Sequence, residues 1–457
     1  MVNTLLTVLA GALLSAGFAP LSLWWAVPIA LALHMYCVNR CARPFLNVFI
    51  FAFTVNAIAL HWTSIYVGST PWIILAIGQG LLFTPLGLAK RFGIAYYPIF
   101  FIVLEEIRGQ FPFGGFGWLR LAYTQADAPY RSIAAVGGAV ALSATTLLIA
   151  LCIFALSQSR LSFFPILPLL ITLIPIHAQL QGSSNVLMIQ GDVPQIGLDF
   201  NARATAVFFN HVAATKAALA EGGKVDFILW PENAVDVDPF TNTQVRATLD
   251  SFTYPMIIGA VIGSNGKLQN ASIMWSKGGQ EVYVKQHLTP FGEYIPLRSL
   301  AAEISPLAVS VEDFSPGTTS KIFTIKEARI APVICFELLD DRLLSNAGKN
   351  SNLIVVQTNS ATFGKSPESL QQLAISRVRA IEHQRNILSV STTGVSAVID
   401  YKGNVDNQTR MHESAHIFTS TALINSQSPR DRAGNWALVG VLIWLLIICA
   451  GPLRRYY

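Results

Sequence analysis

Apolar segments dominate the first 180 residues of this chain, and they restrict its fold more than any other feature of the sequence. A helix that spans a bilayer needs about 20 consecutive, mostly apolar residues. The first segment lacks a basic start and is followed at once by more apolar sequence, which argues against a signal peptide. We therefore expect eight transmembrane helices, at residues 3–17, 20–38, 44–66, 72–89, 92–107, 132–157, 161–179 and 436–452.

Charged residues divide the chain into two kinds of sequence. Only 12% of the residues are charged, against about 25% in a typical soluble protein. Residues 1–180 hold few of these charges, whereas residues 183–432 have the composition of an ordinary soluble domain. We expect a membrane domain at 1–182, a soluble domain at 183–432, and a last transmembrane helix with a short tail at 433–457.

The remaining composition argues against several classes of function. The net charge of +5 is a weak signal, because membrane proteins carry extra Lys and Arg on their cytoplasmic side. No basic run with interleaved aromatic residues indicates nucleic-acid binding, and no glycine-rich phosphate loop is visible. Cys37 and Cys41 could share a helix face, but two thiols alone make a poor metal site. The sequence therefore indicates no nucleic-acid partner, no metal and no cofactor.

Positive residues follow every second apolar span, and such residues favour the cytoplasmic side of a membrane. The residues at these exits are Arg40, Arg43, Lys90, Arg91, Arg160, Arg454 and Arg455. The long connection between the fifth and sixth spans also holds Arg108, Arg120 and Arg131, which run against the rule. The overall pattern predicts that the soluble domain, between the seventh and eighth spans, lies outside the cytoplasm.

The same connection contains an aromatic, glycine-rich segment from Phe111 to Tyr123. Aromatic residues such as Trp118 are typical of the headgroup zone of a membrane. Arg120 among them could pair with a phosphate. Trp118 and Arg120 are therefore candidate lipid-binding residues, and an ordinary aromatic belt is the alternative interpretation.

The region at 183–432 alternates strand-like and helical patterns, which predicts an α/β fold. The predicted strands are Val186–Ile189, Val225–Leu229, Met256–Ile262, Ala271–Trp275, Glu281–Lys285, Ala328–Phe336, Leu353–Gln357, Ile387–Thr392 and Ser396–Asp400. The predicted helices lie at about 202–221, 242–252, 338–347 and 367–384. Residues 304–320, which include Phe314, show little pattern; a mobile active-site loop and a plain connection are both open interpretations.

Three polar side chains come at the ends of predicted strands: Glu232, Lys285 and Cys335. A thiol has a pKa of about 8.5, so it needs a base or a positive neighbour before it attacks a carbonyl. Glu232 can be the base, and Lys285 can stabilise the oxyanion of a tetrahedral intermediate. His287 shares the strand face of Lys285 and is an alternative participant. Each residue alone is more often structural, so the prediction of thioester chemistry rests on the combination.

These three motifs resemble the Glu-Lys-Cys triad of the nitrilase, or carbon-nitrogen hydrolase, superfamily. Further segments are similar to the apolipoprotein N-acyltransferase family within it. They are Gly191–Gln195, Phe291–Leu297, the helix at Arg377–Arg385, Thr393-Gly394, Gly434–Trp436, Phe18–Pro20 and Gly117–Leu119. The resemblance covers almost the whole chain.

The resemblance implies an αββα nitrilase domain, inserted between transmembrane helices 7 and 8 and lying on the periplasmic side of a Gram-negative inner membrane. It implies an acyltransferase in which Cys335 takes an acyl chain from a phospholipid, commonly phosphatidylethanolamine. The thioester then acylates the α-amino group of the N-terminal diacylglyceryl-cysteine of an apolipoprotein, the last step of lipoprotein maturation.

The resemblance also implies roles for single residues. Glu232 is the general base, Lys285 the oxyanion stabiliser and Cys335 the nucleophile. Glu293 positions the triad through Lys285, and Glu337 is a further functional acid. Phe336 stands where the family often has Tyr, so a hydroxyl role is absent there, and the backbone around it is a candidate oxyanion hole.

Two segments depart from the family pattern. Where the family usually has Asn-Asp-Ala-Trp-Phe-Gly, this chain has Asn-Ser-Ala-Thr-Phe-Gly at 359–364, so Ser360 replaces an acid and Thr362 a tryptophan. Thr392-Thr393-Gly394 stands where Asn-Asn-Gly or a close variant is usual. The triad is intact, so activity is expected, with altered packing or substrate preference around it.

Two other functions fit parts of the sequence. A membrane-tethered nitrilase-type amidase would share the triad but use water as the acceptor, and a simple tether needs one helix rather than eight. A transporter with an inactive outer domain would need ionisable residues along a pathway, and the spans contain few, such as Glu105 and Glu106. The acyltransferase is the favoured function, because a site at the bilayer surface would keep water from the thioester and admit acyl chains from lipid.

Overall fold

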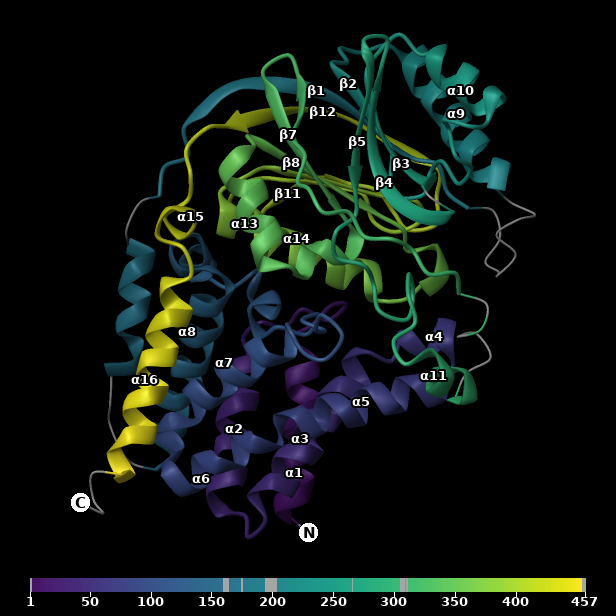
Figure 1. Cartoon of the computed structure of the whole chain (residues 1–457). Coiled ribbons are helices and arrows are strands. Elements are labelled where there is room, and N and C mark those ends of the chain that lie inside the picture. Colours follow the sequence, from purple (N-terminus) through teal and green to yellow (C-terminus); the bar gives the residue numbers. More distant parts are fainter. Residues whose placement is uncertain are drawn as a thin grey trace. The chain divides into compact units, whose positions relative to one another are not determined.

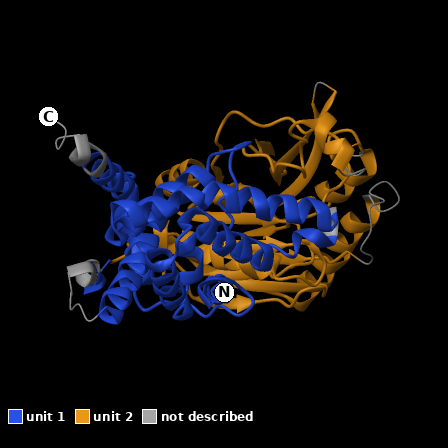
Figure 2. Ribbon diagram, turned by 90° about the horizontal axis from the view of Figure 1, so that it is seen from below, with its two compact units in different colours: residues 1–176, 428–457 blue, residues 177–427 orange. Residues whose placement is uncertain are grey.

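The computed structural model describes residues 2–158, 164–173, 176–193, 204–264, 266–304, 309 and 311–453 (Figure 1). The chain forms two compact units (Figure 2). The apolar N-terminal segments and the last helix make up one unit, and the α/β region makes up the other. Their bounds are 1–176 with 428–457, and 177–427.

The α/β unit is built on two six-stranded sheets. The first contains, in spatial order, β12 (Ala415–Ile424), β1 (Leu180–Gln190), β2 (Phe227–Leu229), β3 (Met256–Ser264), β4 (Lys267–Ser276) and β5 (Gly279–Val284). The second contains β11 (Val405–Gln408), β10 (Ala397–Ile399), β9 (Ile387–Ser391), β8 (Leu353–Thr358), β7 (Ala328–Ile334) and β6 (Phe323–Ile325). Parallel strands form the centre of each sheet, β1-β2-β3 and β7-β8-β9, and antiparallel strands flank them.

Alternating apolar side chains on the central strands create two separate cores, because successive residues of a strand point to opposite faces. In β1, Val186 and Met188 join a core shared by both sheets, whereas Leu187 and Ile189 join a core with the two helices that follow. These helices, α9 (Ala204–Glu221) and α10 (Thr243–Asp250), cover the first sheet, and α13 (Asp341–Asn350) and α14 (Glu368–His383) lie against the second (Figure 1). The layers are therefore helix, sheet, sheet, helix.

The predicted strands correspond to β1 to β5 and β7 to β10, and the predicted helices to α9, α10, α13 and α14. Several predicted strands are one or two residues too long. The strand predicted at Ala328–Phe336 ends at Ile334, because Cys335 has φ +47° and begins a 3₁₀ helix. β6 and β11 were missed because they have only three and four residues. β12 was missed although it has ten residues, and it pairs antiparallel with the distant β1.

The other unit is helical within the described residues. Its α-helices are α1 (Val2–Ser15), α2 (Ala26–Arg40), α3 (Pro44–Ala59), α4 (Thr63–Val67), α5 (Ser69–Phe83), α6 (Ala89–Phe92), α7 (Tyr97–Arg108), α8 (Ala134–Ser157), α15 (Pro429–Ala433) and α16 (Trp436–Leu453). Two helical stretches, Ser69–Phe92 and Arg131–Ser157, are long and apolar enough to cross a membrane. Three further stretches are apolar but shorter: Val2–Ser15, Pro44–Ala59 and Trp436–Ile447.

The seventh predicted span is described only in part. Residues 164–173 form a 3₁₀ helix rather than an α-helix. The other residues of the prediction at 161–163 and 174–175 lie outside the described residues, as do Arg160, Arg454 and Arg455.

Candidate active site

Glu232 lies just beyond the C-terminal end of β2, where both sheets fix the chain. The Trp230 N–H donates to the Ile257 carbonyl at 2.8 Å, and the Trp230 carbonyl accepts from Nε2 of Gln357 at 2.7 Å. On β3, a Cβ atom at Gly259 would lie 2.5 Å from the Cα of Glu232. The absence of that side chain lets β3 approach this backbone, and Glu232 is only 4% exposed.

Lys285 follows β5, is 1% exposed, and lies between two carboxylates. Its Nζ atom is 2.9 Å from Oε2 of Glu293 and 3.3 Å from Oε1 of Glu232. Asn270, on β4, donates through Nδ2 to Oε1 of Glu232 at 2.7 Å and to Oε1 of Glu293 at 2.8 Å. The ammonium and the amide thus hold side by side two acids that would otherwise repel each other.

Cys335 occupies a sharp turn between β7 and a 3₁₀ helix at Cys335–Leu339. Its φ of +47° lies in the left-handed region, which non-glycine residues rarely adopt, and such strain is concentrated at functional sites. The residue is partly exposed, and its Sγ atom is 3.6 Å from Nε2 of Gln372 on α14. The thiol interacts electrostatically with Glu232 and Lys285, so the turn brings it close to both side chains.

Electrostatic coupling joins the three predicted triad residues. Burial and the charge of Glu232 raise the pKa of the Cys335 thiol well above its ordinary value, while Lys285 opposes this rise. Burial raises the pKa of Glu232, although Lys285 opposes this rise. The raised pKa makes the Glu232 carboxylate a stronger base. For Lys285, burial lowers the pKa, but Glu293 and Glu232 together raise it above its ordinary value. The resting site therefore contains a neutral thiol, a basic carboxylate and a permanent cation.

Glu337 is a buried acid that connects the two strand ends. Its Oε2 atom accepts the N–H of Ile334 at 2.8 Å, and its Oε1 atom accepts the hydroxyl of Tyr283 at 2.7 Å. Tyr283 lies on β5 and Ile334 on β7, so the carboxyl group bridges the two sheets. Phe336 is buried beside it, and its ring packs edge-on against that of His287 with centroids 5.2 Å apart.

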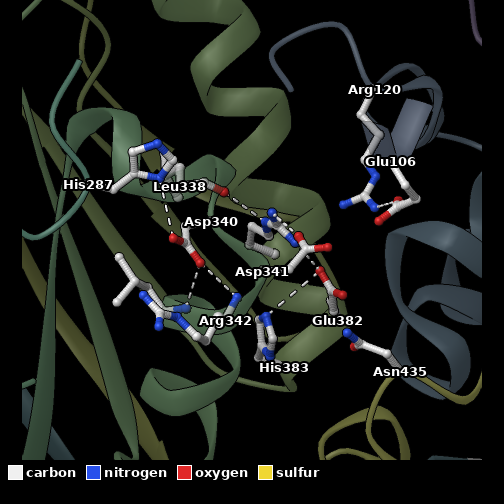
Figure 3. A network of polar contacts seen from close by, with 12 residues as sticks. Glu106, Arg120, His287, Leu338, Asp340, Asp341, Arg342, Glu382, His383 and Asn435 are labelled. Atoms are coloured by element: carbon white, nitrogen blue, oxygen red, sulfur yellow. Dashed lines mark hydrogen bonds and ion pairs between the residues drawn. The ribbon is translucent and has the colours of Figure 1, made fainter. Parts of the chain in front are cut away.

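His287 points to the 3₁₀ helix rather than to the triad. Its Nδ1 atom lies 3.3 Å from Oδ2 of Asp340. Figure 3 draws this contact between the two side chains. Asp340 in turn accepts the N–H groups of Arg342 and Leu343 and caps α13. These contacts give His287 a structural role at the start of α13.

The segment around Phe314 is tied to the site through its backbone. The Phe314 N–H donates to the Glu293 carbonyl at 2.7 Å, and the Gly317 N–H donates to the Lys285 carbonyl at 2.8 Å. A Cβ atom at Gly317 would lie 2.3 Å from the Val284 carbonyl oxygen, so only glycine fits there. Residues 314–317 thus form a fixed connection beside Lys285, whereas 305–308 and 310 lie outside the described residues.

The two candidate lipid-binding residues of the helical unit are both buried. The Trp118 ring centroid lies 5.3 Å from that of Trp62. The Arg120 guanidinium pairs with Glu106, a contact that Figure 3 draws, and lies 3.9 Å from Glu105. The Arg120 guanidinium therefore already has two carboxylate neighbours in this structure.

Asn270 is the site residue that the sequence did not reveal. It directly precedes the predicted strand Ala271–Trp275, and a single buried amide leaves no periodic signal. Gln372 was likewise hidden within a helical pattern. Within the described ranges, no group of three His, Cys, Asp or Glu residues is arranged to hold a metal ion.

Comparison with known proteins divides the chain into two matched regions. Residues 10–152 match the family described as the apolipoprotein N-acyltransferase N-terminal domain, and residues 190–428 match the carbon-nitrogen hydrolase family. Among solved structures, a nitrilase-superfamily member from Saccharomyces cerevisiae aligns with 54% of this chain and 93% of its own, at 16% identity and a TM-score of 0.40.

Similar proteins of known name match over nearly the full length. The apolipoprotein N-acyltransferase of Mycolicibacterium smegmatis is 29% identical over 96% of this chain and 82% of its own length. That of Azotobacter vinelandii is 27% identical over 97% of this chain and 94% of its own.

Proposed function

The chain belongs to the carbon-nitrogen hydrolase family, and from that premise we propose that it is an apolipoprotein N-acyltransferase whose acyl chain passes through Cys335. One observation carries this proposal. A carboxylate, an ammonium and a thiol come together in a unit of nitrilase type, in a chain whose N-terminal region matches the acyltransferase-specific domain. An amidase of the same superfamily would explain the triad but not that N-terminal match.

In the first half-reaction, Glu232 takes the proton of the Cys335 thiol, and the sulfur attacks an ester carbonyl of a phospholipid. The charge that develops on the carbonyl oxygen is stabilised by Lys285, whose ammonium is already held in place by Glu293. Glu232 returns the proton to the departing glycerol oxygen. The products are a lysophospholipid and an acyl thioester on Cys335.

In the second half-reaction, the α-amino group of a diacylated apolipoprotein attacks the thioester carbonyl. A carbon–nitrogen bond forms, the carbon–sulfur bond breaks, and the sulfur regains a proton. Glu337 holds the backbone segments that carry Lys285 and Cys335 at a fixed spacing during both steps. Phosphatidylethanolamine is the proposed donor, and Trp118, Arg120 and Phe314 are proposed lipid contacts.

The proposed site lies at a membrane surface. The proposal places eight transmembrane helices in an inner membrane, with a membrane domain at 1–182, the catalytic domain at 183–432 on the periplasmic side, and the last helix and its tail at 433–457. The pattern of Lys and Arg between the apolar segments supports this orientation.

The test uses the full chain in detergent micelles. Phosphatidylethanolamine alone should add the mass of one acyl chain to the wild-type protein, and a diacylglyceryl-cysteine peptide should remove it again. Neither Cys335→Ala nor Cys335→Ser should give a thioester that hydroxylamine cleaves. Activity that survives in Cys335→Ala would overturn the proposal.

A further inference from the structure

Glu368 is a buried acid that the proposed mechanism does not use. It begins α14 and is only 2% exposed, although a glutamate in the first turn of a helix usually faces solvent. Its Oε2 atom has no hydrogen-bond partner among the described residues. A buried carboxyl oxygen without a donor costs stability, so a donor supplied by a substrate would bind to it favourably.

Glu368 lies on the face of α14 that touches the nucleophile. Gln372 is four residues later, and residues at this spacing are neighbours on one face of a helix. The Nε2 atom of Gln372 reaches Sγ of Cys335 at 3.6 Å. Glu368 also interacts electrostatically with both Cys335 and Glu232. The unpartnered carboxyl group therefore belongs to the surroundings of the thioester.

A second unpartnered oxygen lies nearby, and it occupies the position where the chain lacks the usual acid. The Ser360 hydroxyl lies close enough to the Glu368 carboxyl to oppose the rise of its pKa. Oγ of Ser360 and Oε2 of Glu368 nevertheless each lack a partner with full hydrogen-bond geometry among the described residues. Glu368 thus places a buried carboxyl group beside residue 360, where the resemblance would have an acid. Both oxygens can accept hydrogen bonds, and a cation with several N–H groups would satisfy them.

We propose that Glu368 and Ser360 bind the α-ammonium group of the incoming acceptor, and that Glu368 takes the first of its protons. This inference rests on the proposed function, because it assigns the acceptor subsite of the same site. An α-ammonium is a donor with three N–H groups, and it must lose a proton before its nitrogen can attack a carbonyl.

The proton transfers balance. The ammonium gives one proton to Glu368 and becomes a neutral amine. The amine nitrogen attacks the thioester carbonyl and loses its second proton to Glu232, and the Cys335 sulfur leaves and takes that proton. Glu368 finally releases its own proton to solvent, so an ammonium and a thioester yield an amide, a thiol and a free proton.

The ionisation of Glu368 suits this task. Burial raises the pKa of Glu368 to about 7. The Ser360 hydroxyl opposes this rise, and the Glu232 carboxylate adds a smaller contribution to it. An α-amino group has a pKa of about 8, so the proton transfer is nearly balanced. Glu232 and Cys335 are the titratable groups that act on Glu368 from the first and second sheets. On α13, Asp341 is engaged by Arg379, three turns further along α14.

The test separates the two half-reactions of the full chain in detergent. Protein is first loaded from phosphatidylethanolamine, and transfer to a diacylglyceryl-cysteine peptide is then followed in a single turnover. In Glu368→Gln, the rate of thioester formation should fall by far less than tenfold. The rate of acyl transfer to the peptide should fall about 100-fold relative to wild type. The wild-type transfer rate should rise with pH around 7 more steeply than that of Glu368→Gln, because the ionisation of the peptide amine is common to both.

A double variant gives the sharpest control. Ser360→Asp combined with Glu368→Gln restores an acid at the position usual in the family, and it should recover transfer relative to Glu368→Gln alone. Glu413→Gln removes an exposed carboxylate of the same unit and should behave as wild type. The inference is wrong if Glu368→Gln transfers at the wild-type rate, or if its loading slows as much as its transfer. A wild-type protein that never loads would instead refute the proposed function.

Discussion

The Oε1 atom of Glu337 accepts the backbone N–H of Gln286 at 2.7 Å, directly after the catalytic candidate Lys285. The Oε2 atom of the same carboxyl group accepts the N–H of Ile334, directly before Cys335, at 2.8 Å. One side chain therefore sets the distance between the segment that carries the ammonium and the segment that carries the thiol. This contact gives Glu337 a structural task beside the proposed nucleophile Cys335.

Glu337→Gln should lower both stability and the rate of acyl-enzyme formation. An amide has only one oxygen, so its NH₂ group would face one of the two backbone N–H donors. A buried donor left without an acceptor costs about 1–3 kcal/mol. The melting temperature and the rate of thioester formation of the detergent-solubilised protein measure the two effects. Unchanged values for both would contradict the bridging role, and Glu413→Gln is the exposed control.

Asn270→Ala should slow the reaction without removing any member of the triad. The amide donates to Glu232 at 2.7 Å and to Glu293 at 2.8 Å, so its loss removes one hydrogen-bond donor from each acid. We expect a loss of roughly 10-fold or more in the rate of thioester formation, typical of a removed hydrogen bond to a charged group. Asn270→Asp should be slower still, because it adds a third carboxylate. If Asn270→Asp were as active as wild type, the amide would not be holding the acids together.

The sequence predicted the strand ends that carry Glu232, Lys285 and Cys335, because apolar runs of β-branched residues stop where the polar residues begin. It could not predict how these ends are held together. The sequence around Asn270 contains no pattern that predicts a buried amide at this position. The acid at residue 368 looked like an ordinary first-turn glutamate, and only the fold shows that it is buried beside Ser360.

Arg379 connects α14 to the 3₁₀ turn that follows Cys335. Its guanidinium is fully buried and lies 2.6 Å from Glu382, 2.6 Å from Asp341 and 2.9 Å from the carbonyl oxygen of Leu338. Leu338 belongs to the 3₁₀ helix that Cys335 begins. These contacts therefore help to set the distance between the Cys335 thiol and α14, the helix that carries Gln372.

Arg379→Lys should destabilise the protein, because its single nitrogen atom cannot reach three acceptors that the guanidinium contacts through Nε, Nη1 and Nη2. Arg379→Met should be worse, since removing one partner of a buried ion pair costs about 3–5 kcal/mol. Chemical denaturation in detergent, followed by tryptophan fluorescence, measures the order wild type, Lys, Met. Arg410→Lys, at a largely exposed position, is the matched control. Equal stability of wild type and Arg379→Met would show that the Arg379 contacts do not stabilise the fold.

Glu368 should also make stability fall as pH rises, which is the opposite of the usual behaviour of a paired carboxylate. Burial raises its folded pKa from 4.5 to about 7. A raised folded pKa contributes stability that is fully present below the unfolded pKa and is lost as pH rises through the folded one. Each pKa unit corresponds to about 1.36 kcal/mol, so the loss is of the order of 3 kcal/mol. Glu368→Gln cannot ionise, so it should be no more stable than wild type at low pH but clearly more stable above pH 7. Unfolding curves of the two proteins at several pH values measure this, and parallel pH profiles would mean that the carboxyl group finds a partner when it ionises.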